Sequence, residues 1–101
     1  MPDDSPSLDA AVTCFSHDET GYSRWLDEHP AGYILNCEHV PSSRYLVLHR
    51  ASCSTISGAP ARGTTWTSAY AKVCSKSASD LDNWAKRRTG ALPSRCGQCH
   101  P

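Results

Sequence analysis

The segment "SRCGQCHP", residues 94–101, places Cys96 and Cys99 in a C-x-x-C pattern. Such a turn presents two thiolates to one tetrahedral metal ion, which is half of a four-ligand site. The segment "LHRASC" supplies a second pair, His49 and Cys53, with three residues between them. One imidazole and three thiolates are a common ligand set for structural zinc. The two pairs therefore predict a zinc site.

The fourth ligand has an alternative. Cys74 in place of His49 would give a site of four thiolates, together with Cys53, Cys96 and Cys99. We prefer His49, because its spacing from Cys53 makes a local pair. The remaining cysteines, Cys14 and Cys37, are expected to be small buried core residues, as free cysteine often is.

Two other chemistries match the letters "CGQCH". The C-G-x-C form is typical of thioredoxin-like redox sites, but these need a following helix whose dipole lowers the thiol pKa. Only His100 and Pro101 follow here, so we expect no such helix. The C-x-x-C-H form is typical of covalent haem attachment, which normally accompanies export. No secretory leader is evident, and the only methionine is Met1. Both interpretations are less favoured than zinc.

The segments "YLVLHRASC" and "CGQCHP" resemble the zinc-binding module at the N-terminus of Ada-type DNA repair proteins and its stand-alone relatives. The resemblance covers roughly residues 45–101 and implies zinc on His49, Cys53, Cys96 and Cys99. In the repair proteins the first ligand of the x3 pair is a cysteine that accepts a methyl group from a phosphotriester. His49 stands at that position here and is no such acceptor. The resemblance therefore implies a zinc fold and an affinity for nucleic-acid backbone, without methyl transfer.

The charges of the chain are divided between its two parts. Net charge is zero, yet residues 1–40 carry one base against eight acids and residues 41–101 carry nine bases against two acids. The second part is thus expected to offer a basic surface to nucleic-acid phosphates. Alternatively, the two parts neutralise each other in the fold. The candidate nucleic-acid contacts are Arg44, Arg50, Arg62, Lys72, Lys76, Arg87 and Arg88, and Trp66 and Tyr70 are candidates for base stacking.

The start of the chain, "MPDDSPSLDA", is acidic and polar and lacks the basic and apolar regions of a secretory signal. No apolar run approaches the length of a membrane span. We therefore expect a cytoplasmic protein, in which the six cysteines stay reduced and favour metal binding. Residues 1–13 are expected to be a flexible acidic arm, and residues 14–101 a single zinc-binding domain.

The hydrophobic pattern predicts an α+β fold: a small antiparallel sheet with two helices, held together by a structural zinc site. Tyr22, Trp25 and Leu26 share one face of the first helix, and Leu81 and Trp84 share one face of the second. Trp25 and Trp84 are expected in the core. The predicted elements are helices at 18–29 and 80–89, strands at 32–37, 44–49 and 69–74, and a long loop at 51–68.

These observations favour a small zinc-stabilised module that binds nucleic acid through its basic part. The alternative is a protein–protein interaction module with a purely structural zinc. An enzyme is less favoured, because catalytic zinc needs an open coordination position and a base. Glu38 and His39, between the first two predicted strands, are the only candidates for that base, and the sequence carries no nucleophile–base signature.

Overall fold

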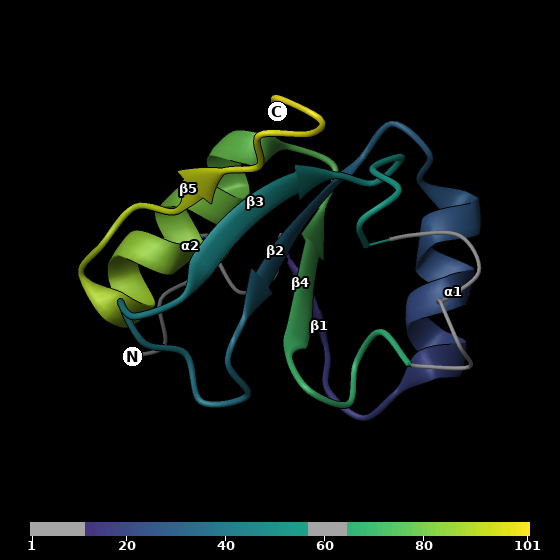
Figure 1. Ribbon diagram of the computed structural model, residues 1–101, viewed down its shortest axis with the longest axis horizontal. Helices are drawn as coiled ribbons and strands as arrows, with labels where there is room; N and C mark the ends of the chain where they lie inside the picture. Colours follow the sequence, from purple (N-terminus) through teal and green to yellow (C-terminus); the bar gives the residue numbers. More distant parts are fainter. Residues whose placement is uncertain (1–11, 57–64) are drawn as a thin grey trace, which may run out of the picture.

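The computed structural model describes residues 12–56 and 65–101 (Figure 1). Two helices and a five-stranded sheet make up this part of the chain, which confirms the α+β class. The sheet order is β1-β4-β2-β3-β5. The elements in chain order are β1 (Thr13–Phe15), α1 (Glu19–Glu28), β2 (Tyr33–Cys37), β3 (Leu46–Arg50), β4 (Ala71–Ser75), α2 (Ala78–Thr89) and β5 (Ser94–Arg95).

The sheet is antiparallel in its centre and parallel at one edge. β2 pairs with β3 and β4, and β4 pairs with β1, all antiparallel. β5 runs parallel to β3, so the predicted antiparallel sheet is in fact mixed. The three longer strands lie within two residues of their predicted ranges. β1 and β5 were not predicted, because three and two residues are too few for an alternating pattern to be recognised.

Alternate residues of the strands build two separate cores, one on each face of the sheet. Ile34 of β2 points to the face covered by α1, where it packs with Tyr22 and Trp25. Its neighbour Leu35 points to the opposite face, where it packs with residues of α2 such as Leu81. Figure 1 shows the two helices at opposite ends of the view with the sheet between them. The metal-binding candidates discussed below belong to the α1 face.

Helix α1 confirms the predicted first helix. Asp18 caps its N-terminus and accepts a hydrogen bond from the backbone N–H of Gly21 at 2.9 Å. Tyr22 and Trp25 are buried, as the helical periodicity predicted. The Tyr22 hydroxyl donates to the carbonyl oxygen of Ile56 at 2.6 Å, so α1 holds the turn that follows β3.

Helix α2 begins at Ala78, two residues before its predicted start. Ser77 is the N-cap residue, and Trp84 is buried against the sheet as expected. Gly90 ends the helix in the left-handed conformation, with φ of 82°, and its backbone N–H donates to the carbonyl oxygen of Lys86. The last turn carries three cations, Lys86, Arg87 and Arg88, which suit the negative end of the helix dipole.

The structure corrects the expectation for Cys14, and most of the predicted N-terminal arm lies outside the described residues. Cys14 is exposed on the edge strand β1 and is not a core residue, whereas Cys37 is buried as predicted. Of the predicted arm, residues 1–11 lie outside the described residues, and Thr13 already belongs to β1. Neither helix in the described ranges has the length and apolar character needed to cross a membrane.

Candidate metal centre

The C-terminal strand brings the two predicted ligand pairs together. His49 lies on β3, and in the turn that follows the backbone N–H of Cys53 donates to the carbonyl oxygen of Arg50 at 2.9 Å. β5 pairs with β3 so that Arg95 stands opposite Leu48. The backbone N–H of Cys96 then donates to the Leu48 carbonyl at 2.9 Å. The parallel pairing therefore carries the C-x-x-C turn to the end of β3 where His49 lies.

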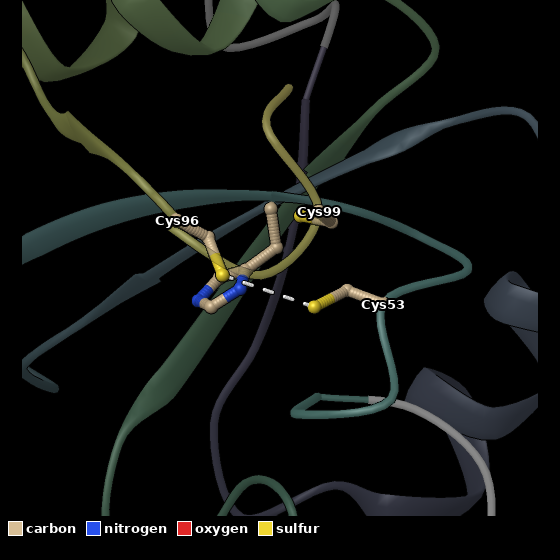
Figure 2. A group of neighbouring side chains, drawn as sticks. Cys53, Cys96 and Cys99 are labelled. Atoms are coloured by element: carbon tan, nitrogen blue, oxygen red, sulfur yellow. Dashed lines mark hydrogen bonds between the residues drawn. The ribbon is translucent and has the colours of Figure 1, made fainter.

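One ligand atom from each of His49, Cys53, Cys96 and Cys99 lies within 4.8 Å of the other three. The sulfurs of Cys53 and Cys96 are 3.9 Å apart, and Figure 2 shows them pointing toward each other. Three of the four residues are buried and Cys99 is half-buried. We call these four residues the His49 cluster. Its composition and spacing are those of a closed metal-binding site.

The His49 side chain has a buried nitrogen that fits this role. Its Nε2 is buried, and among the described residues no hydrogen-bond partner reaches it. Its Nδ1 lies 3.3 Å from Thr55 Oγ1, which itself lies 2.9 Å from the sulfur of Cys53. An unpaired buried polar atom costs about 1–3 kcal/mol, and a bound metal would remove that cost. Burial, with a smaller contribution from Lys72, lowers the pKa of His49 and so favours the neutral, metal-binding imidazole.

Backbone amides surround the two sulfurs of the C-x-x-C turn. Gln98 donates its N–H to the sulfur of Cys96 at 3.3 Å, and Arg50 donates its N–H to the sulfur of Cys99 at 3.2 Å. Burial opposes ionisation of Cys96, but hydrogen bonds from the backbone of Cys99 and Gln98 and from the side chains of Cys53 and Cys99 outweigh it, so the pKa of Cys96 is lowered. Burial raises the pKa of Cys99 to about 11. The turn thus favours a thiolate first at Cys96.

Arg50 was predicted to contact phosphates, but its side chain binds the C-terminal tail. Its Nε donates to the carbonyl of Cys99 at 2.9 Å and its Nη2 to the carbonyl of His100 at 3.1 Å. The guanidinium also lies 6.0 Å from the centre of the Tyr33 ring. A planar donor group engaged in this way holds the ligand turn in place.

The alternative fourth ligand, Cys74, lies elsewhere. It is buried in the middle of β4, where it is paired with Ile34 of β2 and Thr13 of β1. It is not a member of the His49 cluster. Burial strongly raises the pKa of its thiol. Cys74 is therefore a core residue, and His49 completes the group of four.

Lys72 was predicted to contact nucleic acid, but the structure places its side chain inside the fold. Its side chain is 3% exposed. Its Nζ donates to Asn36 Oδ1 at 2.7 Å and to the carbonyl of Trp66 at 2.6 Å. Burial lowers the pKa of Lys72 to about 8. An ammonium group enclosed in this way supports the fold and does not reach a phosphate.

The remaining predicted contacts are spread over several elements. Arg44 is exposed and forms an ion pair with Glu38 at 3.4 Å. Trp66 is half-buried against the α1 core, and Tyr70 is exposed beside the ring of Tyr45. Arg62 lies outside the described residues. Three other predicted nucleic-acid contacts are exposed: Lys76 after β4, and Arg87 and Arg88 at the end of α2.

One pair of polar side chains escaped the sequence analysis. Ser16 Oγ lies 2.6 Å from Nδ1 of His39, although 23 residues separate them along the chain. Nε2 of the same ring lies 2.7 Å from the carbonyl oxygen of Ser68. His39 was considered only as a base for a catalytic zinc. No sequence spacing marks its contact with Ser16, because the contact depends on the edge strand β1.

Comparison of the chain with protein-family models, with curated proteins and with solved structures found no significant match.

Proposed function

We propose that the chain is a small domain whose fold is completed by one structural Zn²⁺ ion bound to His49, Cys53, Cys96 and Cys99. The observation that carries the proposal is the convergence of these four ligand atoms within 4.8 Å, from segments on either side of α2. Soft thiolate ligands favour zinc over magnesium or calcium. Four protein ligands fill a tetrahedral shell, which leaves no position for a substrate, so the role is structural.

The sulfur separation supports this choice of ion. Two sulfurs bound to one tetrahedral zinc at about 2.3 Å each would stand about 3.8 Å apart. The Cys53 and Cys96 sulfurs are 3.9 Å apart. The contact of Thr55 Oγ1 with Nδ1 of His49 also fits, because a metal-binding imidazole usually has its second nitrogen hydrogen-bonded.

Elemental analysis of the purified chain tests the proposal. We expect one zinc per chain after extensive dialysis, and less than a tenth of that in Cys53→Ser. Cys37→Ser is the matched control, because Cys37 is equally buried but lies in the opposite core. A zinc-free wild-type protein that stays folded, or full zinc retention in Cys53→Ser, would contradict the proposal.

We further propose that this module binds the backbone of nucleic acid. Its support is the resemblance to Ada-type zinc modules and the net charge of +7 on residues 41–101. The binding surface is narrower than the sequence suggested, since Lys72 is buried and Arg50 holds the tail. The proposed binding surface centres on three exposed cations at the end of α2: Lys86, Arg87 and Arg88. Salt dependence of binding, described in the Discussion, is the test.

A protein–protein interaction module is the second candidate. Two large apolar side chains support it: Val40 is 82% exposed and Leu92 is 65% exposed. Such side chains are common at protein interfaces but are also found singly on ordinary surfaces. A chain that stays folded with zinc and binds no nucleic acid at low salt would favour this candidate.

A further inference from the structure

The contacts of His39 determine where its proton lies. A carbonyl oxygen only accepts hydrogen bonds, so Nε2, 2.7 Å from the Ser68 carbonyl, must carry the proton and donate it. In the neutral ring Nδ1 is then bare, and it accepts the hydroxyl hydrogen of Ser16 at 2.6 Å. A serine hydroxyl, a bare imidazole nitrogen and a group that orients the ring are the arrangement of an activated nucleophile.

The ring of His39 is also held from its face. The His17 ring stacks on it, with centroids 4.4 Å apart and planes 10° apart. His17 has a positive φ of 53°, which is uncommon for a residue other than glycine, and its backbone N–H donates to Thr67. Locally strained backbone of this kind gathers at functional sites. The base is thus fixed by one hydrogen bond in its plane and by one stacked ring.

A cavity of about 320 Å³ is lined in part by His39, the partner of Ser16. Its volume is at the lower end of the range for small-molecule sites. Most of its walls are apolar, but the guanidinium of Arg88 adds a positive charge, which lies over the Trp84 ring at 5.3 Å. Ser16 is exposed and so is open to a ligand. The lining residues are Val12, Cys14, His39, Pro41, Trp84 and Arg88.

We propose that Ser16 and His39 form a hydrolytic site for small carboxylic esters that carry a negative charge. Ser16 is the nucleophile and His39 is the general base, and both touch the reacting atoms. The apolar wall receives the carbon chain of the ester, and Arg88 attracts its anionic group. The site shares no residue with the His49 cluster, so the zinc takes no part in its chemistry.

The reaction proceeds in two balanced steps. The Ser16 oxygen bonds to the ester carbonyl carbon while its proton passes to Nδ1 of His39. The bond from that carbon to the alcohol oxygen then breaks, and His39 returns the proton to the departing alcohol. Water next gives a proton to His39 and attacks the acyl-Ser16 carbonyl. The carboxylic acid leaves, and the proton returns to the Ser16 oxygen.

The first test is covalent labelling of the zinc-loaded full chain with diisopropyl fluorophosphate, read by peptide mass spectrometry. We expect one label on Ser16, none there in Ser16→Ala, and at least 100-fold slower labelling in His39→Gln. Glutamine can accept and donate hydrogen bonds as His39 does, so the fold should be kept. It is no base, so only the activation of Ser16 is lost. Ser43→Ala, which removes another exposed serine hydroxyl, is the control and should label at the wild-type rate.

Circular dichroism melting of each variant ensures that only folded proteins are compared. The proposal is overturned if Ser16 in the folded wild type reacts no faster than Ser43, or if His39→Gln labels at the wild-type rate. In the latter case the Ser16–His39 contact only joins β1 to its neighbouring loops.

The second test concerns the substrate class. Hydrolysis of p-nitrophenyl hemisuccinate, an anionic ester, should exceed that of neutral p-nitrophenyl acetate in kcat/KM. Arg88→Gln should raise KM for the anionic ester about tenfold and leave the neutral ester unchanged, since only the former pairs with the guanidinium. Equal effects on both esters would refute the role of Arg88, and turnover by Ser16→Ala equal to that of wild type would refute the site itself.

Discussion

Arg50 and Cys99 are joined by two hydrogen bonds. The backbone N–H of Arg50 donates to the sulfur of Cys99 at 3.2 Å, and the guanidinium Nε donates to the Cys99 carbonyl at 2.9 Å. One residue of β3 therefore supports both the thiol and the backbone of a turn 49 positions away. Because Arg50 directly follows His49, this contact also ties the two halves of the His49 cluster together.

Replacement of Arg50 by lysine tests this support. Lysine keeps the charge, but its single ammonium cannot reproduce the planar set of donors that reaches the carbonyls of Cys99 and His100. We expect zinc affinity to fall about tenfold, the lower end of the range for loss of a supporting contact around a metal site. Competition with a chromophoric chelator measures it. Arg24→Lys, on the exposed face of α1, is the control, and equal affinities for both variants would contradict the role of Arg50.

Chelation and cysteine replacement test whether metal and fold are coupled. Metal binding contributes about 10 kcal/mol to the folding of small zinc peptides, so its removal should unfold most of this domain. We expect EDTA treatment and Cys96→Ser each to abolish the cooperative melting transition seen by circular dichroism. Cys14→Ser should melt like the wild type, because Cys14 is exposed at the sheet edge. A normal transition in Cys96→Ser would show that the fold does not depend on this ligand.

The parts of the site that could be predicted from sequence were local. His49 and Cys53 form one short-range pair, and Cys96 and Cys99 form another, so the residue types and spacing were sufficient to select them. The contact between the pairs depends on the parallel pairing of β5 with β3. A strand of two residues has no periodicity, and the sequence therefore could not show how the tail lies.

The errors have equally specific causes. Lys72 lies in a strand whose five residues are all buried, and its charge suggested a surface position. Its partners, Asn36 and the Trp66 carbonyl, come from separate segments and are not visible as a pattern. Cys14 was assigned to the core because free cysteine is usually buried, but it lies on a short edge strand.

The burial of Lys72 gives a pH dependence of stability. Its pKa is about 8 in the fold and 10.5 as its ordinary value, so the unfolded chain binds more protons between these limits. The contribution of Lys72 to the free energy of unfolding therefore rises with pH between about 8 and 10.5. Over the whole range the increase is on the order of 3 kcal/mol. Below pH 8 the buried ammonium is charged and the gain is absent.

We expect Lys72→Met to remove that gain. The raised pKa values of the buried thiols make their own contribution to folding fall as pH rises. The quantity to follow is therefore the difference in the free energy of unfolding between Lys72→Met and the wild type. Urea unfolding at pH 7, 8, 9 and 10 should show that the free energy of unfolding of the wild type rises with pH relative to that of Lys72→Met. Lys76→Met, at an exposed position beyond β4, is the control and should track the wild type. A difference that stays constant with pH would contradict the lowered pKa.

Two glycines offer a matched test of packing around the sheet. A Cβ at Gly32 would lie 2.6 Å from Cη2 of Trp25 and 3.1 Å from the Ser75 carbonyl. Gly32→Ala should therefore lower the free energy of unfolding by about 1–3 kcal/mol, the usual effect of overpacking. A Cβ at Gly97, in the ligand turn, would meet nothing within 4 Å, so Gly97→Ala should stay within about 0.5 kcal/mol of wild type. Equal stability of the two variants in urea would show that Trp25 is free to shift.

The proposed nucleic-acid surface is tested by charge reversal at the end of α2. Phosphate contacts release counterions, so affinity should fall steeply with salt, and each lost contact should lower the slope of log K against log[salt] by about one unit. Arg87→Glu should weaken binding to all sequences alike, because backbone contacts carry no base information. Arg24→Glu, in the acidic first part of the chain, is the control and should bind like the wild type.

Removal of acidic N-terminal residues should have the opposite effect on nucleic-acid binding to Arg87→Glu. If residues 1–40 screen the basic surface, a chain without residues 1–11, which carry three of the acids, should bind more tightly at low salt. Fluorescence anisotropy with labelled single- and double-stranded DNA and RNA, at two or more salt concentrations, measures both effects. If neither the full chain nor the shortened one binds any of these at low salt, the nucleic-acid proposal is wrong. The exposed Val40 and Leu92 would then direct the search to a protein partner.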